Sequence, residues 1–196
     1  MFRKVIAGMV AVVGLSAGVM PVADAAPQQV VQLGGVPGDQ LNGLTELVVQ
    51  RILIADDVAA SKYFSGKPVD DPVREQQILT SVRASAVQLG IDADETAAFF
   101  QAQIDASKVV QRGLLAYWAA HPDQAPTTGP DLTVIRQKLD ALTTQLLTEL
   151  VRTNNLRHSG LHCDVALIVA DATAAARHHV DALHRAALRT ASTATC

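Results

Sequence analysis

Aromatic residues, cysteines and strand-like patterns are all scarce in this sequence. Aromatic residues make up 4% of the 196 residues, and only two cysteines occur. No stretch alternates apolar and polar residues as half-buried strands do, and we find neither an internal repeat nor a glycine-rich loop of the kind that binds phosphates. Apolar residues, many of them alanine, recur instead at steps of three and four. This pattern predicts an all-α protein.

An excess of basic charge is also missing. The formal net charge is −3 at pH 7, whereas a protein that binds nucleic acid needs a basic surface. Beyond Ala25, no stretch is apolar enough to span a bilayer. We therefore expect neither nucleic acid nor, once the N-terminal segment is removed, a membrane as a partner.

The N-terminal segment, residues 1–25, has the pattern of a signal peptide. Arg3 and Lys4 precede an apolar run at residues 5–15, and Ala-Asp-Ala at residues 23–25 offers the small residues that a signal peptidase reads. We expect cleavage after Ala25 and a secreted or periplasmic protein. A retained membrane anchor is the alternative.

The remaining chain divides into a leader and one domain. Residues 26–40 are rich in Gly, Pro and Gln, which predicts a flexible leader, and residues 41–196 have the length of a single domain. We expect a bundle of about five to six helices, with helices at about residues 41–64, 71–89, 92–120, 131–152 and 163–189. The last of these should bury Val165, Val169, Ala172, Ala176, Val180 and Leu183.

The two cysteines, Cys163 and Cys196, both lie near the C-terminus, and Cys196 is the final residue. In an exported protein such a pair predicts a disulfide. The bond would tie the C-terminus to the start of the last helix and add roughly 3–4 kcal/mol of stability on the loop-entropy model. Two free thiols and a metal pair are the alternatives.

The first predicted helix places two cations on an apolar face. Leu44, Val48, Arg51, Ala55, Val58 and Lys62 follow one another at steps of four and three, which is one helix face. A cation on an inward face is unfavourable unless an anion meets it. The partner could be an anionic ligand, or the two side chains could reach solvent or a distant carboxylate.

Two further helices add polar groups. Ser107 and Gln111 interrupt the apolar face of the third helix, where local backbone bonds are the alternative role. Asp71, Arg74 and Glu75 share a face at the start of the second helix, where Asp71 is also expected as the N-cap. Because cations outnumber acids in the combined set, we expect a pocket for an anion such as a dicarboxylate.

In their order, these residues resemble the motif of the all-helical chorismate mutases. The motif is R-x10-K (Arg51 and Lys62), D-x2-R-E (residues 71–75) and S-x3-Q (Ser107 and Gln111). The signal peptide, the chain length and the cysteine pair are similar to the secreted subclass, over about residues 41–196. The resemblance implies the type II chorismate mutase fold, a homodimer, and Arg136 as a further pocket residue. Some secreted members have Glu at position 111 and lack the acid at 75, a difference that should move the pH optimum.

The resemblance implies an isomerase that converts chorismate to prephenate in aromatic amino acid biosynthesis, without a cofactor or a metal. Arg51, Arg74 and Arg136 would bind the two carboxylates. Lys62 and Gln111 would donate to the ether oxygen. Glu75 would accept from the ring hydroxyl, and Ser107 and Asp71 would support the substrate.

Two other classes of protein remain as alternatives. A secreted helical binding or inhibitor module could share the signal peptide and disulfide, but it has no need for three arginines and a lysine in one pocket. A metal-dependent helical bundle would need repeated Glu-x-x-His pairs. Asp181 and His184 give a single Asp-x-x-His. A chorismate turnover assay and a metal analysis separate these alternatives from the isomerase.

Overall fold

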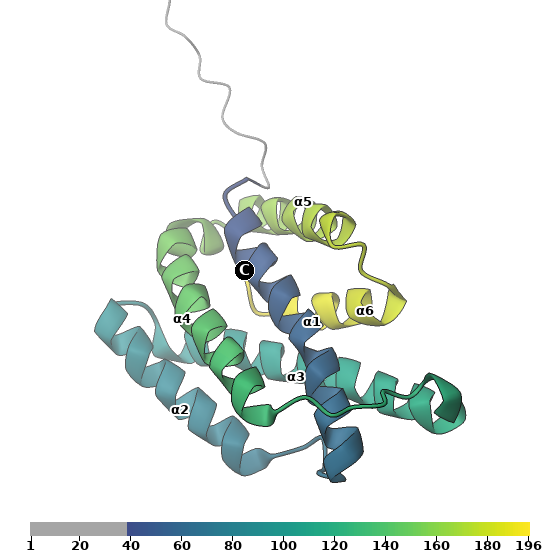
Figure 1. Cartoon of the computed structure of the whole chain (residues 1–196). Helices are drawn as coiled ribbons and strands as arrows, with labels where there is room; N and C mark the ends of the chain where they lie inside the picture. Colours follow the sequence, from purple (N-terminus) through teal and green to yellow (C-terminus); the bar gives the residue numbers. More distant parts are fainter. Residues whose placement is uncertain (1–38) are drawn as a thin grey trace, which may run out of the picture. The chain divides into compact units, whose positions relative to one another are not determined.

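The computed structural model describes residues 39–196, and within that range it contains helices and no strands (Figure 1). The elements are α1 (Asn42–Ser65), α2 (Pro72–Leu89), α3 (Ala93–Ala120), the short 3-10 helix η1 (Pro122–Gln124), α4 (Leu132–Arg157), α5 (Leu161–Arg177) and α6 (Ala182–Ser192). The all-α prediction is confirmed. Among the described helices, none has the length and hydropathy needed to cross a bilayer. The predicted signal peptide and residues 26–38 of the leader lie outside the described residues.

Local capping explains the ends of the first three helices. The Asp71 side chain accepts a hydrogen bond from the Arg74 N–H at 3.0 Å, and Pro72 begins α2. The Asp92 side chain accepts from the Asp94 and Glu95 N–H groups at the start of α3, both at 2.8 Å. Gly66 and Gly90 end α1 and α2 with φ of 66° and 73°, a conformation that glycine adopts without strain. The predicted bounds of these helices agree with the structure to within one or two residues.

The predicted bounds of the last helices were wrong. Helix α4 continues to Arg157, not to residue 152, and the Thr153 hydroxyl donates to the Glu149 carbonyl within the same helix at 2.6 Å. The helix predicted at residues 163–189 is two helices, α5 and α6. The chain breaks at His179, with φ of 49°, and Asp181 then caps α6 by accepting from the His184 N–H at 2.9 Å. Because the Asp181 carboxylate bonds to a backbone N–H as an N-cap, it favours the start of a new helix over continuation of α5.

The predicted inner face of the last helix was also wrong in α5. The residues that α5 buries are Cys163, Ala166, Ala170 and Ala174. Val165 is 44% exposed, and Ala172 and Ala176 are exposed as well. Because α5 is apolar around most of its circumference, periodicity does not decide which face packs.

Helix α1 lies at the centre of the domain, against α3, α4, α5 and α6, while α2 packs along α3 and α4 (Figure 1). The buried core joins residues of α1, α3, α4 and the last two helices, among them Leu44, Val48, Ile52, Phe99, Phe100, Leu146 and Leu150. Arg51 is on the same inward face as Leu44 and Val48. This arrangement brings the cationic face of α1 toward the space that α2, α3 and α4 enclose.

His184 fastens α6 to α1. Its Nε2 donates to Asp56 Oδ1 at 2.9 Å and its Nδ1 donates to Asp181 Oδ1 at 2.7 Å. The bond to Asp56 and the nearby Asp181 carboxylate raise the pKa of His184 to about 9, although burial opposes this shift. The Asp-x-x-His pair noted in the sequence is therefore a helix cap and an ion pair between a buried histidine and an exposed carboxylate.

The predicted disulfide between Cys163 and Cys196 is confirmed, with the two Cα atoms 5.8 Å apart. Neither cysteine lines the main cavity described below. The bond therefore joins the end of the chain to the start of α5 at a distance from the predicted site residues.

Reduction of this disulfide should lower the melting temperature by roughly 10 °C and leave activity at low temperature unchanged. The loss corresponds to about 3–4 kcal/mol on the loop-entropy model. Scanning calorimetry of the oxidised protein, the reduced protein and the Cys163→Ser/Cys196→Ser double variant measures the effect. Two thiols that titrate in native protein purified in air, or activity that disappears with the bond at low temperature, would contradict this expectation.

Candidate active site

A cavity of about 720 Å³ lies between α1, α2, α3 and α4 and reaches the segment that joins α1 to α2. All eight site residues predicted from the sequence line it: Arg51, Lys62, Asp71, Arg74, Glu75, Ser107, Gln111 and Arg136. Apolar side chains, including Val58, Ile78 and Leu139, form much of the remaining wall. The structure thus brings seven residues from four helices, and the α2 N-cap Asp71, around one space.

Arg51 is a buried cation, with 6% of its surface exposed. Its Nη1 donates to Thr143 Oγ1 at 3.2 Å and to the Leu139 carbonyl at 3.4 Å, and its guanidinium carbon lies 5.9 Å from the centre of the Phe100 ring. Within residues 39–196, no carboxylate forms an ion pair with it. Burial lowers the pKa of Arg51 to about 10, and the more distant Asp140 carboxylate opposes this shift. The cavity wall therefore contains a positive charge that lacks a close counter-ion.

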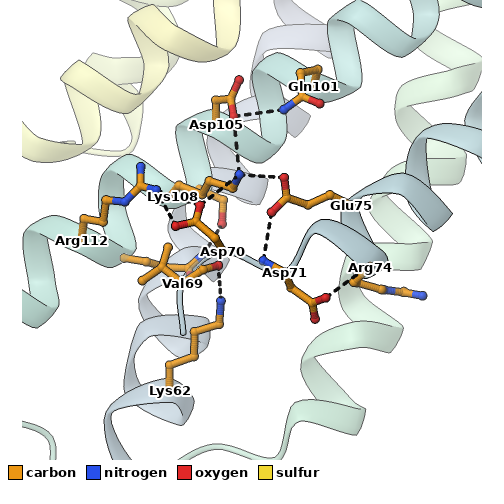
Figure 2. Close-up of polar contacts among 12 residues, drawn as sticks. Lys62, Val69, Asp70, Asp71, Arg74, Glu75, Gln101, Asp105, Lys108 and Arg112 are labelled. Atoms are coloured by element: carbon orange, nitrogen blue, oxygen red, sulfur yellow. Dashed lines mark hydrogen bonds and ion pairs between the residues drawn. The ribbon is translucent and has the colours of Figure 1, made fainter. Parts of the chain in front are cut away.

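Lys62 lies in the last turn of α1, where its Nζ donates to the Val69 carbonyl at 2.7 Å (Figure 2). Burial lowers the pKa of this amine, and the nearby Asp71, Asp70 and Glu75 carboxylates oppose the shift. A lysine ammonium has three N–H donors. Two donors of Lys62 therefore remain for a ligand.

Two arginines lie at the rim of the cavity. The Arg74 side chain is 41% exposed, and its Nη2 lies 3.8 Å from Asp140 Oδ1. Arg136 on α4 is exposed. An exposed ion pair of this length contributes little stability, so either guanidinium can turn toward a ligand.

Ser107 and Gln111 bond to each other within α3. Gln111 Nε2 donates to Ser107 Oγ at 2.9 Å, and Gln111 is 4% exposed. Its Oε1 is buried and has no partner among the described residues. A flip of the amide exchanges the two groups, so that Ser107 donates to the oxygen and the NH2 group is left unpaired. An unpaired buried amide group costs about 1–3 kcal/mol, which a ligand in the cavity would offset.

The sequence did not single out Lys108, Asp70 or Asp140, which also line the cavity. Lys108 Nζ donates to Glu75 Oε2 at 2.7 Å (Figure 2). Burial tends to lower the pKa of Lys108, but the bonds to Glu75 and Asp70 outweigh it and raise the pKa. Lys108 directly follows Ser107 and so lies off the apolar face of α3. No local pattern points to it, because its two closest partners, Asp70 and Glu75, are on other elements.

The lining of the cavity has an excess of positive charge. Its cations are Arg51, Lys62, Lys67, Arg74, Lys108 and Arg136, and its carboxylates are Asp70, Asp71, Glu75 and Asp140. The six cations and four carboxylates leave two positive charges to be balanced, which suits a dianion. The described lining contains no histidine and no cysteine. The arrangement therefore favours binding and electrostatic stabilisation of charge over nucleophilic catalysis.

Comparison with known proteins gives consistent matches. Residues 42–112 match the family described as chorismate mutase type II. The chain is 38% identical over 156 residues to the secreted chorismate mutase of Mycolicibacterium smegmatis, which covers 78% of this chain and 84% of that protein. It is 30% identical over 157 residues to the secreted chorismate mutase of Mycobacterium tuberculosis, a match that covers 80% of this chain and 78% of that protein. The crystal structure of chorismate mutase from Burkholderia phymatum superposes with a TM-score of 0.78 at 33% identity, over 83% of this chain and 99% of that chain.

Proposed function

This chain belongs to the type II chorismate mutase family, and on that premise we propose how its cavity converts chorismate to prephenate. The main support is the cavity of about 720 Å³, whose lining has two more cations than carboxylates and where the buried Arg51 lacks a carboxylate partner among the described residues. Chorismate is a dicarboxylate, so its two charges balance the excess. The enzyme is an isomerase that uses electrostatic and conformational catalysis.

The reaction is an intramolecular [3,3] rearrangement, in which one carbon–oxygen bond breaks as one carbon–carbon bond forms. It needs neither a covalent intermediate nor a proton transfer. An enzyme can accelerate it by holding the compact conformer of the substrate and by stabilising the negative charge that grows on the ether oxygen. Both tasks require donors at fixed positions, which the helices around this cavity provide.

Three arginines bind the carboxylates in this proposal. Arg51 forms the inner contact, because it is buried and its side chain is held by Thr143 and Leu139. Arg74 and Arg136 approach from the rim. Each guanidinium offers a planar pair of donors that matches a carboxylate. Together they hold the substrate with its two reacting carbons close to each other.

Two donors meet the ether oxygen. Lys62 keeps two N–H groups free beside its bond to Val69, and Gln111 supplies an amide N–H from α3. Ser107 orients the Gln111 amide and supports a carboxylate. Glu75 accepts from the ring hydroxyl, and Asp71 shapes the site as the cap of α2.

Replacing Gln111 by glutamate should make the reaction depend strongly on pH. An ionised carboxylate accepts hydrogen bonds only, so it would repel the charge that grows on the ether oxygen. Activity of Gln111→Glu should therefore fall as pH rises through the pKa of the new carboxyl group, while the parent stays level through neutral pH. Gln137→Glu, an exposed position outside the cavity lining, is the matched control. If the activity of Gln111→Glu did not change with pH, Gln111 would not contact the ether oxygen.

The decisive test of the function is turnover by the purified mature protein. The absorbance of chorismate should fall as prephenate appears in equal amount. Stable chorismate under these conditions would favour the alternative of a secreted helical binding or inhibitor module.

Relatives named secreted chorismate mutases support export of this chain. We propose that residues 1–25 are the signal peptide, that cleavage follows Ala25, that residues 26–40 form a flexible leader, and that the mature enzyme is a homodimer. The intact mass of the exported protein tests the cleavage site, and sedimentation equilibrium tests the dimer.

A further inference from the structure

The Glu75 carboxylate is held from two sides. Its Oε1 accepts from the Asp71 backbone N–H at 3.1 Å, and its Oε2 accepts from Lys108 Nζ at 2.7 Å (Figure 2). The side chains of Glu75 and Lys108 are only 19% and 14% exposed. Because each oxygen has its own donor, the carboxylate has one preferred orientation at the cavity wall.

Lys108 is itself surrounded by carboxylates. Besides Glu75, its Nζ lies 3.3 Å from Asp70 Oδ1 and 3.9 Å from Asp105 Oδ1. Gln101 Nε2 in turn donates to Asp105 Oδ1 at 3.0 Å (Figure 2). These acids belong to three parts of the chain: α2, the segment before it, and α3 itself. The ammonium therefore has a defined position between α3 and the start of α2.

The two acids on other elements depend on Lys108 to different degrees. Asp70 also accepts two bonds from Arg112 Nη2, at 2.8 and 2.9 Å. Glu75 has no side-chain partner other than Lys108 among the described residues. Loss of Lys108 therefore leaves Asp70 anchored by Arg112, whereas Glu75 keeps only the bond from the Asp71 N–H to its Oε1.

We propose that Lys108 is a positioning residue that acts through Glu75. It fixes the Glu75 carboxylate and balances its charge, so that Glu75 can accept from the hydroxyl of a ligand that carries two negative charges itself. Without Lys108, the carboxylate would repel such a ligand and could rotate away from the cavity. This inference rests on the proposed function of the same site.

A double-mutant cycle tests the proposal by kinetics. Lys108→Met should lower kcat/KM for chorismate by about 10- to 100-fold, the scale of a small misplacement in an active site, and Lys108→Arg should restore most of it. In a Glu75→Gln background the same Lys108→Met change should cost less than about 3-fold, whereas in an Asp70→Asn background it should keep its full effect. Lys138→Met is the matched control, because Lys138 pairs with Asp57 at 3.7 Å and does not line the cavity.

Equal losses from Lys108→Met in the parent and Glu75→Gln backgrounds would overturn the proposal. The proposal would also be overturned if the kcat/KM loss from Lys108→Met disappeared only in the Asp70→Asn background. Lys108 would then act by anchoring the segment between α1 and α2. A second test does not depend on catalysis: the pKa of the Lys108 amine is measured by NMR titration of the full protein without ligand. Glu75→Gln should lower its pKa, and an unchanged value would also overturn the proposal. Wild-type turnover of chorismate reports on the proposed function separately from this ion pair.

Discussion

Replacing Lys62 by alanine should lower kcat for chorismate by at least ~10²–10³-fold, the scale for loss of one preorganised donor to a developing oxyanion. The loss should appear in kcat more than in KM, because the ether oxygen gains its charge only in the transition state. The fold should survive, since burial already lowers the pKa of Lys62 and its removal relieves that desolvation. Steady-state kinetics with circular dichroism as the folding control measure both effects.

The bond between Lys62 and the Val69 carbonyl provides a second explanation that the kinetics can separate. If Lys62 only anchors the segment between α1 and α2, the variant should show a raised KM with a kcat within a factor of about ten of the parent. Lys138→Ala, which removes a lysine outside the cavity lining, should leave both parameters unchanged. In the parent enzyme, kcat/KM should fall on the alkaline side at a pH below the ordinary pKa of lysine, because burial lowers the pKa of Lys62.

Arg51→Met should abolish most activity without lowering the stability of the ligand-free protein. Burial holds the pKa of Arg51 at about 10, so the unfolded chain binds this proton more tightly than the folded protein does. At any pH below about 10, the buried charge therefore destabilises the fold, by about 3 kcal/mol. The penalty is relieved only as the pH rises above the folded pKa.

The neighbours of Arg51 tolerate its removal. The Thr143 hydroxyl already donates to the Leu139 carbonyl at 2.8 Å, so neither group is left unpaired when the guanidinium disappears. Methionine fills a similar volume, and the melting temperature should stay level or rise. The loss of a two-point carboxylate contact should lower kcat/KM by at least ~10²-fold. Arg189→Met, on the exposed face of α6, is the control for loss of one positive charge. A clear drop in melting temperature, or retained activity, would contradict the proposed role of Arg51.

Local chemistry in the sequence was sufficient for the first three helices, and together with the family resemblance it predicted eight site residues. Asp71, Asp92, Gly66 and Gly90 set helix ends through bonds or backbone angles that involve residues a few positions away. The helical period then directs Arg51 and Lys62 to one face, and all eight predicted residues do line one cavity. Their chemical roles remain predictions.

Packing between distant segments accounts for the features that the sequence analysis missed. Two interactions fix the break before α6. One is the local cap at Asp181, and the other is the bond between His184 and Asp56, which are 128 positions apart in the chain. The buried face of α5 depends on which side of an almost wholly apolar helix meets α1. Lys108 pairs with Glu75 across 33 positions. Sequence periodicity reports which residues share a face of one helix, whereas the partner of that face follows from how the helices pack, and that information is not local.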